Sequence, residues 1–168
     1  MHAEGVHCPE SNLKLASGFC PAAKLLANGI NVAIGTDGCA SNNNLDLFGE
    51  MHTAALLGKA VACDASALSA SQTLEMATIN GAKALGLDTV IGSLEVGKDA
   101  DIIALRFDPL EQGPLFNPLS QLIYTHNGHR ITHSWVRGKP LMENRQLRTL
   151  NERDIIRNTA VWQNRIQA

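Results

Sequence analysis

The stretch Asn31-Val-Ala-Ile-Gly-Thr-Asp37-Gly-Cys-Ala-Ser41-Asn-Asn-Asn44 decides the fold. Its apolar beginning, closed by Gly35, predicts a short buried strand that leads into a loop of small residues. In α/β proteins, functional side chains follow the carboxyl ends of parallel strands, which makes Asp37 a candidate active-site carboxylate. The spacing is equally compatible with an Asp37 that only caps the next helix, among asparagines that form turns.

Helical patterns flank this strand on both sides. Helices are predicted over residues 21–28, 45–61 and 70–85. Gly29 and Gly86 stand where C-terminal caps belong, and Ser69 with Gln72 has the spacing of a capping box. Strands that alternate with helices in this order predict β/α units with parallel strands.

The pattern becomes β-rich near residue 90. Residues 102–105 form an apolar strand, and polar and apolar residues alternate on both sides of a turn at Gly138. The last segment, 151–166, has the pattern of an amphipathic helix that Asn151 can cap. We therefore expect an α/β part over residues 1–90 and a β-rich part over residues 91–168. The strand at 102–105 should pair with the strand around Trp135, in a sheet separate from the first.

Composition and charge exclude several classes of function. The chain has 168 residues, 45% of them hydrophobic and 18% charged, and a net charge of −2. This balance gives no electrostatic footprint for nucleic acid or an anionic membrane, and no uncharged run is apolar enough to span a bilayer. The start lacks signal-peptide features, and the four cysteines are too widely spaced for a zinc knuckle or an expected disulfide framework. We expect a soluble, cytoplasmic, globular protein with free thiols.

The segment His7-Cys-Pro-Glu-Ser-Asn12 offers a second group of candidate residues. It also follows a short apolar start and opens a loop. His7 could bind a metal, bind substrate or move protons, although a lone histidine is more often a hydrogen-bonded structural residue. Ser11 and Asn12 are equally compatible with a simple turn.

Two further groups of titratable residues are weaker candidates. His126, His129 and His133 surround a predicted Asn-Gly turn, so no rigid element holds them, and solvated loop histidines are favoured over a zinc site. Glu50 and His52 lie on one predicted helix and face different directions, so they form no dyad. Glu50 could support the Asp37 loop, but a solvated helix face is favoured.

Four blocks of sequence, in this order, resemble the amidohydrolase superfamily. They are HCPESNLKLASG (7–18), GTDGCASNNNLDLFGEM (35–51), TLEMATINGAKALGL (73–87) and IGSLEVGKDADIIAL (91–105). The resemblance is closest to the 5-methylthioadenosine/S-adenosylhomocysteine deaminase branch, near the chlorohydrolase-like enzymes. It implies a TIM-type (β/α)8 barrel with one divalent metal, usually zinc, and a small β-sandwich. The substrate class it implies is a small-molecule purine nucleoside.

The resemblance also implies roles for individual residues. Residues 7–12 would lie at the end of barrel strand seven and Asp37 at the end of strand eight. Asp37 would bind the metal and carry a proton from the attacking water toward the leaving amine. We expect substrate contacts at Asp37 itself, His7, Ser11, Asn12 and Ser41.

Several parts of the family pattern have no counterpart in this sequence. The HxH pair of strand one, the histidines of strands five and six and the catalytic glutamate are missing, and a whole barrel takes about 250 residues. Cys39 stands where alanine is expected, and His52 where arginine is common. We therefore expect the C-terminal portion of an enzyme, inactive alone and completed by missing barrel units or by a homo-oligomer. The alternative is a non-catalytic remnant that associates with other chains and lacks the metal site.

Overall fold

Two parallel strands form the sheet of the α/β part in the computed structural model, which describes residues 4–167. Strand β1 (Glu4–His7) pairs with β2 (Asn31–Ile34), so that Glu4 lies opposite Asn31 and His7 opposite Ile34. The predicted parallel pairing is confirmed. Because both strands run the same way, the loops that carry the candidate residues leave the sheet at the same edge.

Contacts along the chain group it into two compact units. The first contains residues up to 98 together with 107–130, and the second contains 99–106 together with the chain from 131 onward. The chain therefore enters the second unit at residue 99, returns to the first unit over residues 107–130, and then completes the second unit. The division of domains expected near residue 90 stays a prediction.

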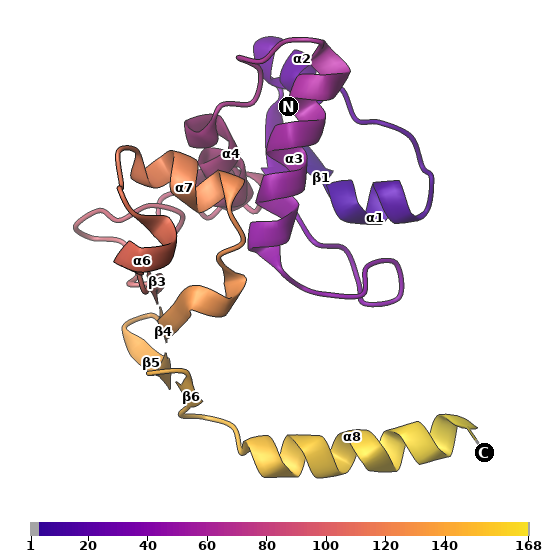
Figure 1. Ribbon diagram of the computed structural model, residues 1–168, viewed down its shortest axis with the longest axis vertical. Helices are drawn as coiled ribbons and strands as arrows, with labels where there is room; N and C mark the ends of the chain where they lie inside the picture. The colour runs from indigo at the N-terminus through magenta and orange to yellow at the C-terminus, as the bar shows by residue number, and fades with distance from the viewer. Residues whose placement is uncertain (1–3, 168) are drawn as a thin grey trace. The chain divides into compact units, whose positions relative to one another are not determined.

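Helices surround the two strands of the first unit (Figure 1). They are α1 (Pro9–Lys14), α2 (Ala22–Ala27), α3 (Leu47–Ala62), α4 (Ala70–Ala77), α5 (Ile79–Ala84), α6 (Pro109–Gln112), α7 (Pro118–Tyr124) and a 3₁₀ turn, η1 (Gly128–Arg130). Their shared core includes Val32, Met51, Ala54, Ala55, Met76 and Ile123, all at most 3% exposed. Packing of its apolar side chains against α3, α4 and α5 holds β2 in place, and α7 covers α3 and α4.

The helix predicted over residues 70–85 is wrong as a single element, because it divides at Thr78. Its start is as predicted, since Ser69 and Gln72 form a complete capping box. Thr78 leaves helical geometry with φ −129° and ψ −95°. Beyond it, the Asn80 side chain donates to the Val32 carbonyl at 3.1 Å, and the Asn80 carbonyl accepts from the Asn31 side chain at 3.0 Å. A straight helix could not make this pair of contacts with β2, so tertiary hydrogen bonds override the local pattern.

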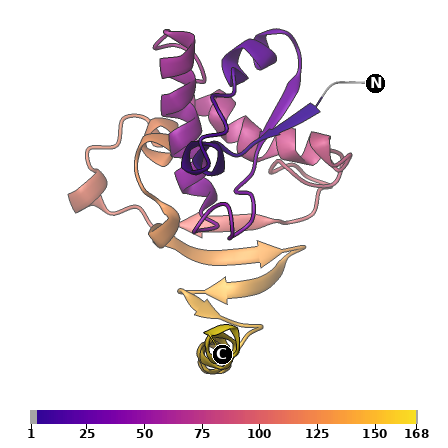
Figure 2. The same ribbon diagram turned by 90° about the vertical axis from the view of Figure 1, so that its right-hand side faces the viewer.

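The second unit contains a four-stranded antiparallel sheet in the order β3-β4-β5-β6 (Figure 2). Its strands are β3 (Ile102–Leu105), β4 (Ile131–Val136), β5 (Lys139–Glu143) and β6 (Gln146–Leu147). Ile102 lies opposite Trp135 and Ile103 opposite Ser134, which confirms the predicted pairing and the separate sheet. The β4–β5 turn places Arg137 and Gly138 at positive φ, as a tight hairpin turn requires.

The last element is helix α8 (Glu152–Gln167). Asn151 caps it as predicted, since its side chain accepts from the Arg153 N–H at 3.0 Å. None of its described residues is buried, and apolar side chains such as Trp162 and Ile166 are exposed.

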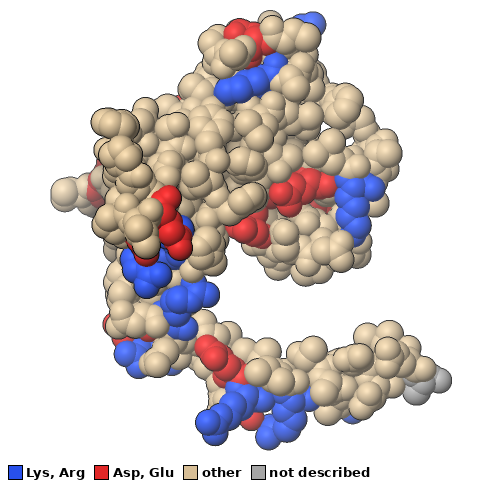
Figure 3. Space-filling model, viewed as in Figure 1, with Lys and Arg blue, Asp and Glu red and all other residues tan. Residues whose placement is uncertain are grey.

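Charged side chains of both signs are interspersed on the face drawn in Figure 3, and much of the first unit there is uncharged. This agrees with the net charge of −2. Among residues 4–167, no helix combines the length and the apolar character needed to cross a membrane.

Candidate active site

Asp37 lies three residues after the end of β2 and presents its carboxylate to solvent. Its backbone adopts the left-handed region with φ 59°, which aspartate tolerates better than most residues. The Gly38 N–H donates to Asp37 Oδ1 at 2.7 Å and fixes the carboxylate in this turn. The strand and its loop therefore place an exposed carboxylate at the sheet edge, as predicted.

Ser11 brings the second predicted loop to this carboxylate. The prediction of a loop over residues 7–12 is wrong, because helix α1 begins with Pro9, two residues after β1 ends. Ser11 lies on this helix, and its side chain is buried. Ser11 Oγ donates to Asp37 Oδ2 at 2.7 Å. The proximity predicted for the two loops is confirmed, and the hydroxyl occupies one of the two carboxylate oxygens.

Hydrogen bonds favour the ionised form of Asp37. The hydroxyls of Ser41 and Ser11 and the N–H of Gly38 lower the pKa of Asp37 below its usual range. Ser41 also donates to the Gly38 carbonyl at 3.1 Å, so it ties the loop to itself beside the carboxylate. An ionised, exposed carboxylate that donors hold in one orientation is suited to bind a cation or to accept a proton.

His7 and Asn12 belong to the segment that carries Ser11, but neither is described with a side-chain hydrogen bond to Asp37. His7 is 4% exposed, and among residues 4–167 its Nδ1 atom has no hydrogen-bond partner. Burial lowers the pKa of His7, so the imidazole is neutral at pH 7. Asn12 is half-buried, and its N–H donates to the Cys8 carbonyl at 3.0 Å. The unpaired ring nitrogen of His7 can still accept or donate one hydrogen bond.

The prediction of a solvated Glu50 is wrong, because its side chain is fully buried on α3. Glu50 Oε2 accepts from the Glu10 N–H at 3.1 Å, and Glu50 Oε1 accepts from Asn42 Nδ2 at 2.6 Å. Burial raises the pKa of Glu50 to about 7, and the negative charges of Glu10 and Asp37 add to the rise. The signal that could have found Glu50 is its place one turn before the buried Ala54, on the apolar face of the helix.

Two of the three histidines in residues 126–133, His126 and His133, have separate environments. The His126 ring lies 5.1 Å from the His52 ring in the first unit, and His52 Nδ1 is 3.1 Å from the Ile123 carbonyl. His133 stacks on Trp135 in the second unit, at 5.4 Å between ring centroids. In the part of the chain that the structure describes, no group of three or more His, Cys, Asp or Glu residues could hold a metal ion.

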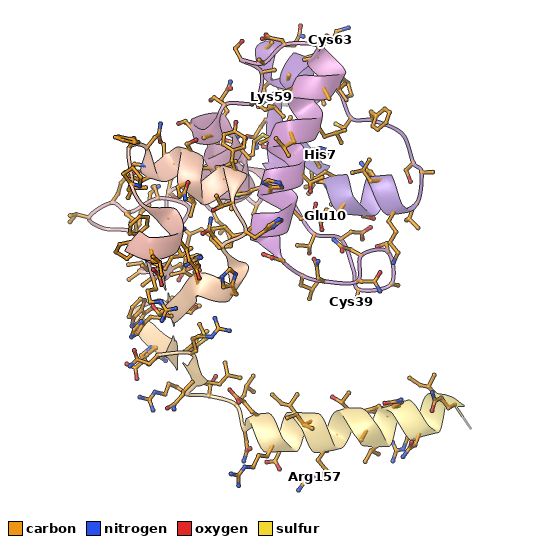
Figure 4. The ribbon with its side chains drawn as sticks, in the orientation of Figure 1. His7, Glu10, Cys39, Lys59, Cys63 and Arg157 are labelled. Carbon is orange, nitrogen blue, oxygen red and sulfur yellow. The ribbon has the colours of Figure 1, made fainter. Side chains whose placement is uncertain are left out.

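Asp37 fits a divalent metal as one ligand of a larger set. It is charged, exposed and held by hydrogen bonds that leave lone pairs available. A catalytic zinc site takes about three protein ligands besides water. Asp37 could contribute one ligand to such a set, and Cys39, which is exposed on the same loop, lies two residues further along the chain (Figure 4).

Comparison with known proteins settles the family. A family model described as the amidohydrolase family matches residues 1–141. The chain belongs to the amidohydrolase family. The resemblance seen in the four sequence blocks is thereby confirmed.

Two curated relatives of this amidohydrolase chain match almost its whole length. It is 57% identical to the 5-methylthioadenosine/S-adenosylhomocysteine deaminase of Saccharophagus degradans and 54% identical to that of Teredinibacter turnerae. Each match covers 99% of this chain but 37% and 38% of the relatives, respectively. The chain therefore spans little more than a third of the length of these relatives.

Solved amidohydrolase structures give the same result. A zinc-bound adenosine deaminase from Xanthomonas campestris is 53% identical, with a TM-score of 0.95 over 98% of this chain and 37% of that one. An atrazine chlorohydrolase from Arthrobacter aurescens, complexed with zinc, is 32% identical with a TM-score of 0.85 over 93% of this chain and 35% of that one. The mixed α/β architecture described above is thus shared with members of the family.

Proposed function

We propose that this chain forms the last two β/α units of a TIM-type (β/α)8 barrel and part of a small β-sandwich in a metal-dependent deaminase. The substrates would be adenine nucleosides such as 5-methylthioadenosine or S-adenosylhomocysteine. The observation that carries the proposal is the 2.7 Å contact between Ser11 Oγ and Asp37 Oδ2, because it joins polar loops at the carboxyl ends of two parallel strands. The names of the relatives support the substrate class.

In this proposal Asp37 binds zinc, or another divalent metal, and carries a proton from the attacking water toward the leaving amine. Asp37 is ionised before substrate arrives, as both roles require, and its lowered pKa favours binding of a cation over uptake of a proton. A bound metal would supply a water of lowered pKa as the nucleophile. Ser11 would hold one carboxylate oxygen, so that the other lone pairs face the metal and the substrate.

The substrate contacts we propose are Asp37, His7, Ser11, Asn12 and Ser41. The unpaired Nδ1 atom of the buried His7 supports a polar contact there, since buried polar atoms in folded proteins nearly always have a partner. The remaining metal ligands would come from barrel units outside residues 4–167, either from a longer chain or from an assembly. For that reason the chain alone should bind metal weakly and should not turn over substrate.

The experiment measures ammonia release from 5-methylthioadenosine and S-adenosylhomocysteine in the presence of zinc. We expect no turnover by the 168-residue chain and turnover when the other barrel units are supplied. In that complete enzyme, Asp37→Asn should lower kcat by several orders of magnitude, because the charge that binds the metal is lost. A rate per folded molecule that Asp37→Asn leaves unchanged would show that Asp37 is only structural.

Two outcomes of this experiment would contradict the proposal. Turnover by the isolated 168-residue chain that survives rigorous removal of contaminating deaminase, and disappears with Asp37→Asn, would overturn the claim that other units are needed. A complete enzyme that binds zinc but deaminates neither nucleoside would overturn the substrate assignment.

A further inference from the structure

Glu50 is a buried residue that hydrogen-bonds both segments of the candidate site, helix α1 and the loop after β2. It lies on α3 with 0% exposure, and each of its carboxylate oxygens accepts one hydrogen bond from a different loop. Oε2 accepts from the Glu10 N–H in the first turn of α1, and Oε1 accepts from Asn42 Nδ2 in the loop after β2. One buried side chain therefore holds the two segments that bring Ser11 to Asp37.

Asn42 extends this connection through the Asp37 loop. Its Nδ2 atom also donates to the Thr36 carbonyl at 3.0 Å, and its backbone N–H donates to the Gly38 carbonyl at 2.8 Å. Asn42 Oδ1 accepts from the Asn44 N–H at 3.3 Å. The loop is thus wound around the Asn42 amide, whose orientation is fixed because its nitrogen faces acceptors and its oxygen faces a donor.

Helix α1 has a second attachment to α3 on the other side of Glu50. Thr53 Oγ1 donates to Glu10 Oε1 at 3.0 Å, and Figure 4 labels Glu10 on α1. A Cβ atom added at Gly49 would lie 3.1 Å from Glu10 Oε1, so the absence of a side chain there lets α1 approach. Gly49, Glu50 and Thr53 of α3 therefore all pack against Glu10 of α1, the residue directly before Ser11.

Burying the Glu50 carboxylate between these two segments is energetically unfavourable. The groups facing it are themselves acidic, namely Glu10 on α1, Asp37 on the β2 loop and the Cys8 thiol after β1. Among the described residues, none of the ion pairs includes Glu50. Burying a charge without a cation is unfavourable, whereas a neutral side chain of the same size would pack here at lower cost. As a carboxylate, Glu50 offers one acceptor oxygen to each of the two donors.

We propose that Glu50 is a positioning residue, which ties α1 to the Asn42 loop and so fixes the Asp37 carboxylate against Ser11. This inference rests on the proposed function of Asp37 for its catalytic consequence. The geometric part, that Glu50 orders the two loops, stands on the contacts alone. Glu50→Gln keeps the shape but turns one acceptor into a donor, which must then face either the Glu10 N–H or the Asn42 amide.

The test compares Glu50→Gln with the control Glu75→Gln, which changes an exposed glutamate on α4 whose side chain accepts from Ser71 Oγ at 3.2 Å. In the complete zinc-loaded enzyme, we expect Glu50→Gln to lower kcat about 10- to 100-fold, with KM within about threefold of the original value. Glu75→Gln should leave both constants unchanged. A kcat within twofold of the original in a folded Glu50→Gln enzyme would overturn the proposal.

A double-mutant cycle separates positioning from general stability. Because Glu50 acts through the Ser11–Asp37 contact, Ser11→Ala combined with Glu50→Gln should lower kcat little more than the more severe single change. Fully multiplicative losses would mean that Glu50 acts by another route. If Glu50→Gln does not fold, Asn42→Ala decides instead, since it removes the Asn42 donor to Glu50 Oε1 and leaves Glu50 itself unchanged. A lowered kcat at unchanged KM supports the proposal, and unchanged constants refute it.

Amide hydrogen exchange gives a readout that does not depend on activity. Glu50→Gln should accelerate exchange at least about tenfold in residues 8–12 and 36–44, because each lost hydrogen bond lowers the free energy of local opening by about 1.4 kcal/mol. Glu75→Gln should not. Should the unchanged complete enzyme deaminate neither nucleoside, the proposed function fails while this exchange pattern still decides whether Glu50 orders the loops. Equal exchange in both variants would overturn the ordering role.

Discussion

Ser11 acts on Asp37 through one short hydrogen bond, so its hydroxyl can be removed with little other change. Ser11→Ala should raise the pKa of Asp37 toward its ordinary value, because one of the donors that favour the ionised form is lost. The measurement is an NMR titration of the Asp37 carboxyl carbon.

Ser66→Ala is the matched control for this titration, since Ser66 Oγ donates to the exposed Asp64 at 2.7 Å and lowers its pKa in the same way. It should raise the pKa of Asp64 and leave that of Asp37 unchanged. An Asp37 titration that Ser11→Ala does not move would mean that the contact contributes nothing to the ionisation.

Replacing two helical glycines by alanine should change the stability of the fold in opposite directions. A Cβ atom at Gly58 would lie 2.2 Å from Leu68 Cδ1, and Leu68 is 1% exposed in the core. Gly58→Ala should therefore destabilise the fold by about 1–3 kcal/mol in spite of the better helix propensity of alanine. Gly81 on α5 has open space around the same position, so Gly81→Ala should stabilise by about 0.5–1 kcal/mol. Urea unfolding of both variants measures the difference, and equal signs would contradict the packing argument.

The site residues that follow a strand could be predicted from sequence, whereas Glu50, which supports them from a helix, had only the weaker signal of its place on the apolar face of that helix. Asp37 lies in the loop after β2 and Ser11 in the helix that follows β1, and position after two parallel strands is enough to bring them to one end of the sheet. The burial of Glu50 depends on α1 packing over α3, a contact between segments 40 residues apart. A glutamate on a helix is ordinarily solvated, and only the partners supplied by that packing make its burial acceptable.

Among the elements, the capping box at the start of α4 offers the clearest test of local sequence signals. Ser69 Oγ accepts from the Gln72 N–H at 3.3 Å, and the Gln72 side chain accepts from the Ser69 N–H at 3.0 Å. Ser69→Ala should lower the free energy of unfolding by about 1 kcal/mol, because one N–H of the first turn loses its acceptor. Ser71→Ala, in the same turn but without a capping role, should lower the free energy of unfolding much less. Thermal unfolding of both variants measures the difference.

The same segment shows where local signals stop being sufficient. Ser69, Gln72 and Gly86 correctly predict the two ends of the helical region, since caps act through backbone groups within a few residues. The break at Thr78 has no comparable local signal. It exists because Asn80 bonds both to Val32 and to Asn31, which lie nearly 50 residues earlier on β2.

The stability of the whole molecule should depend on pH through Glu50. Its pKa of about 7 lies above the ordinary 4.5, so between these values the native state binds more protons than the unfolded state. The contribution of Glu50 to stability is therefore complete below about pH 4.5 and is lost as pH rises through 7, with a total on the order of 3 kcal/mol.

His7 contributes in the opposite direction within part of this range. Its pKa is lowered below 6.5 by burial, so stability from this group falls as pH decreases below 6.5. Subtracting the curve of Glu50→Gln from that of the unchanged chain removes the His7 contribution, which both share. The difference should decline steadily between pH 4.5 and 7 in urea titrations. A flat difference would place the pKa of Glu50 near its ordinary value.

The return of residues 107–130 to the first unit, after β3 has already entered the second, has a consequence for synthesis on the ribosome. Ile123 of α7 is fully buried in the first unit, so the core cannot close when α5 emerges. At about 5–20 residues per second, the stretch from residue 84 to residue 130 takes roughly 2–9 s to translate. During that interval the nascent α3 and α4 lack the cover that α7 later provides. Chaperone capture should therefore peak in this window, and synonymous codons that slow it should lower the yield of folded protein.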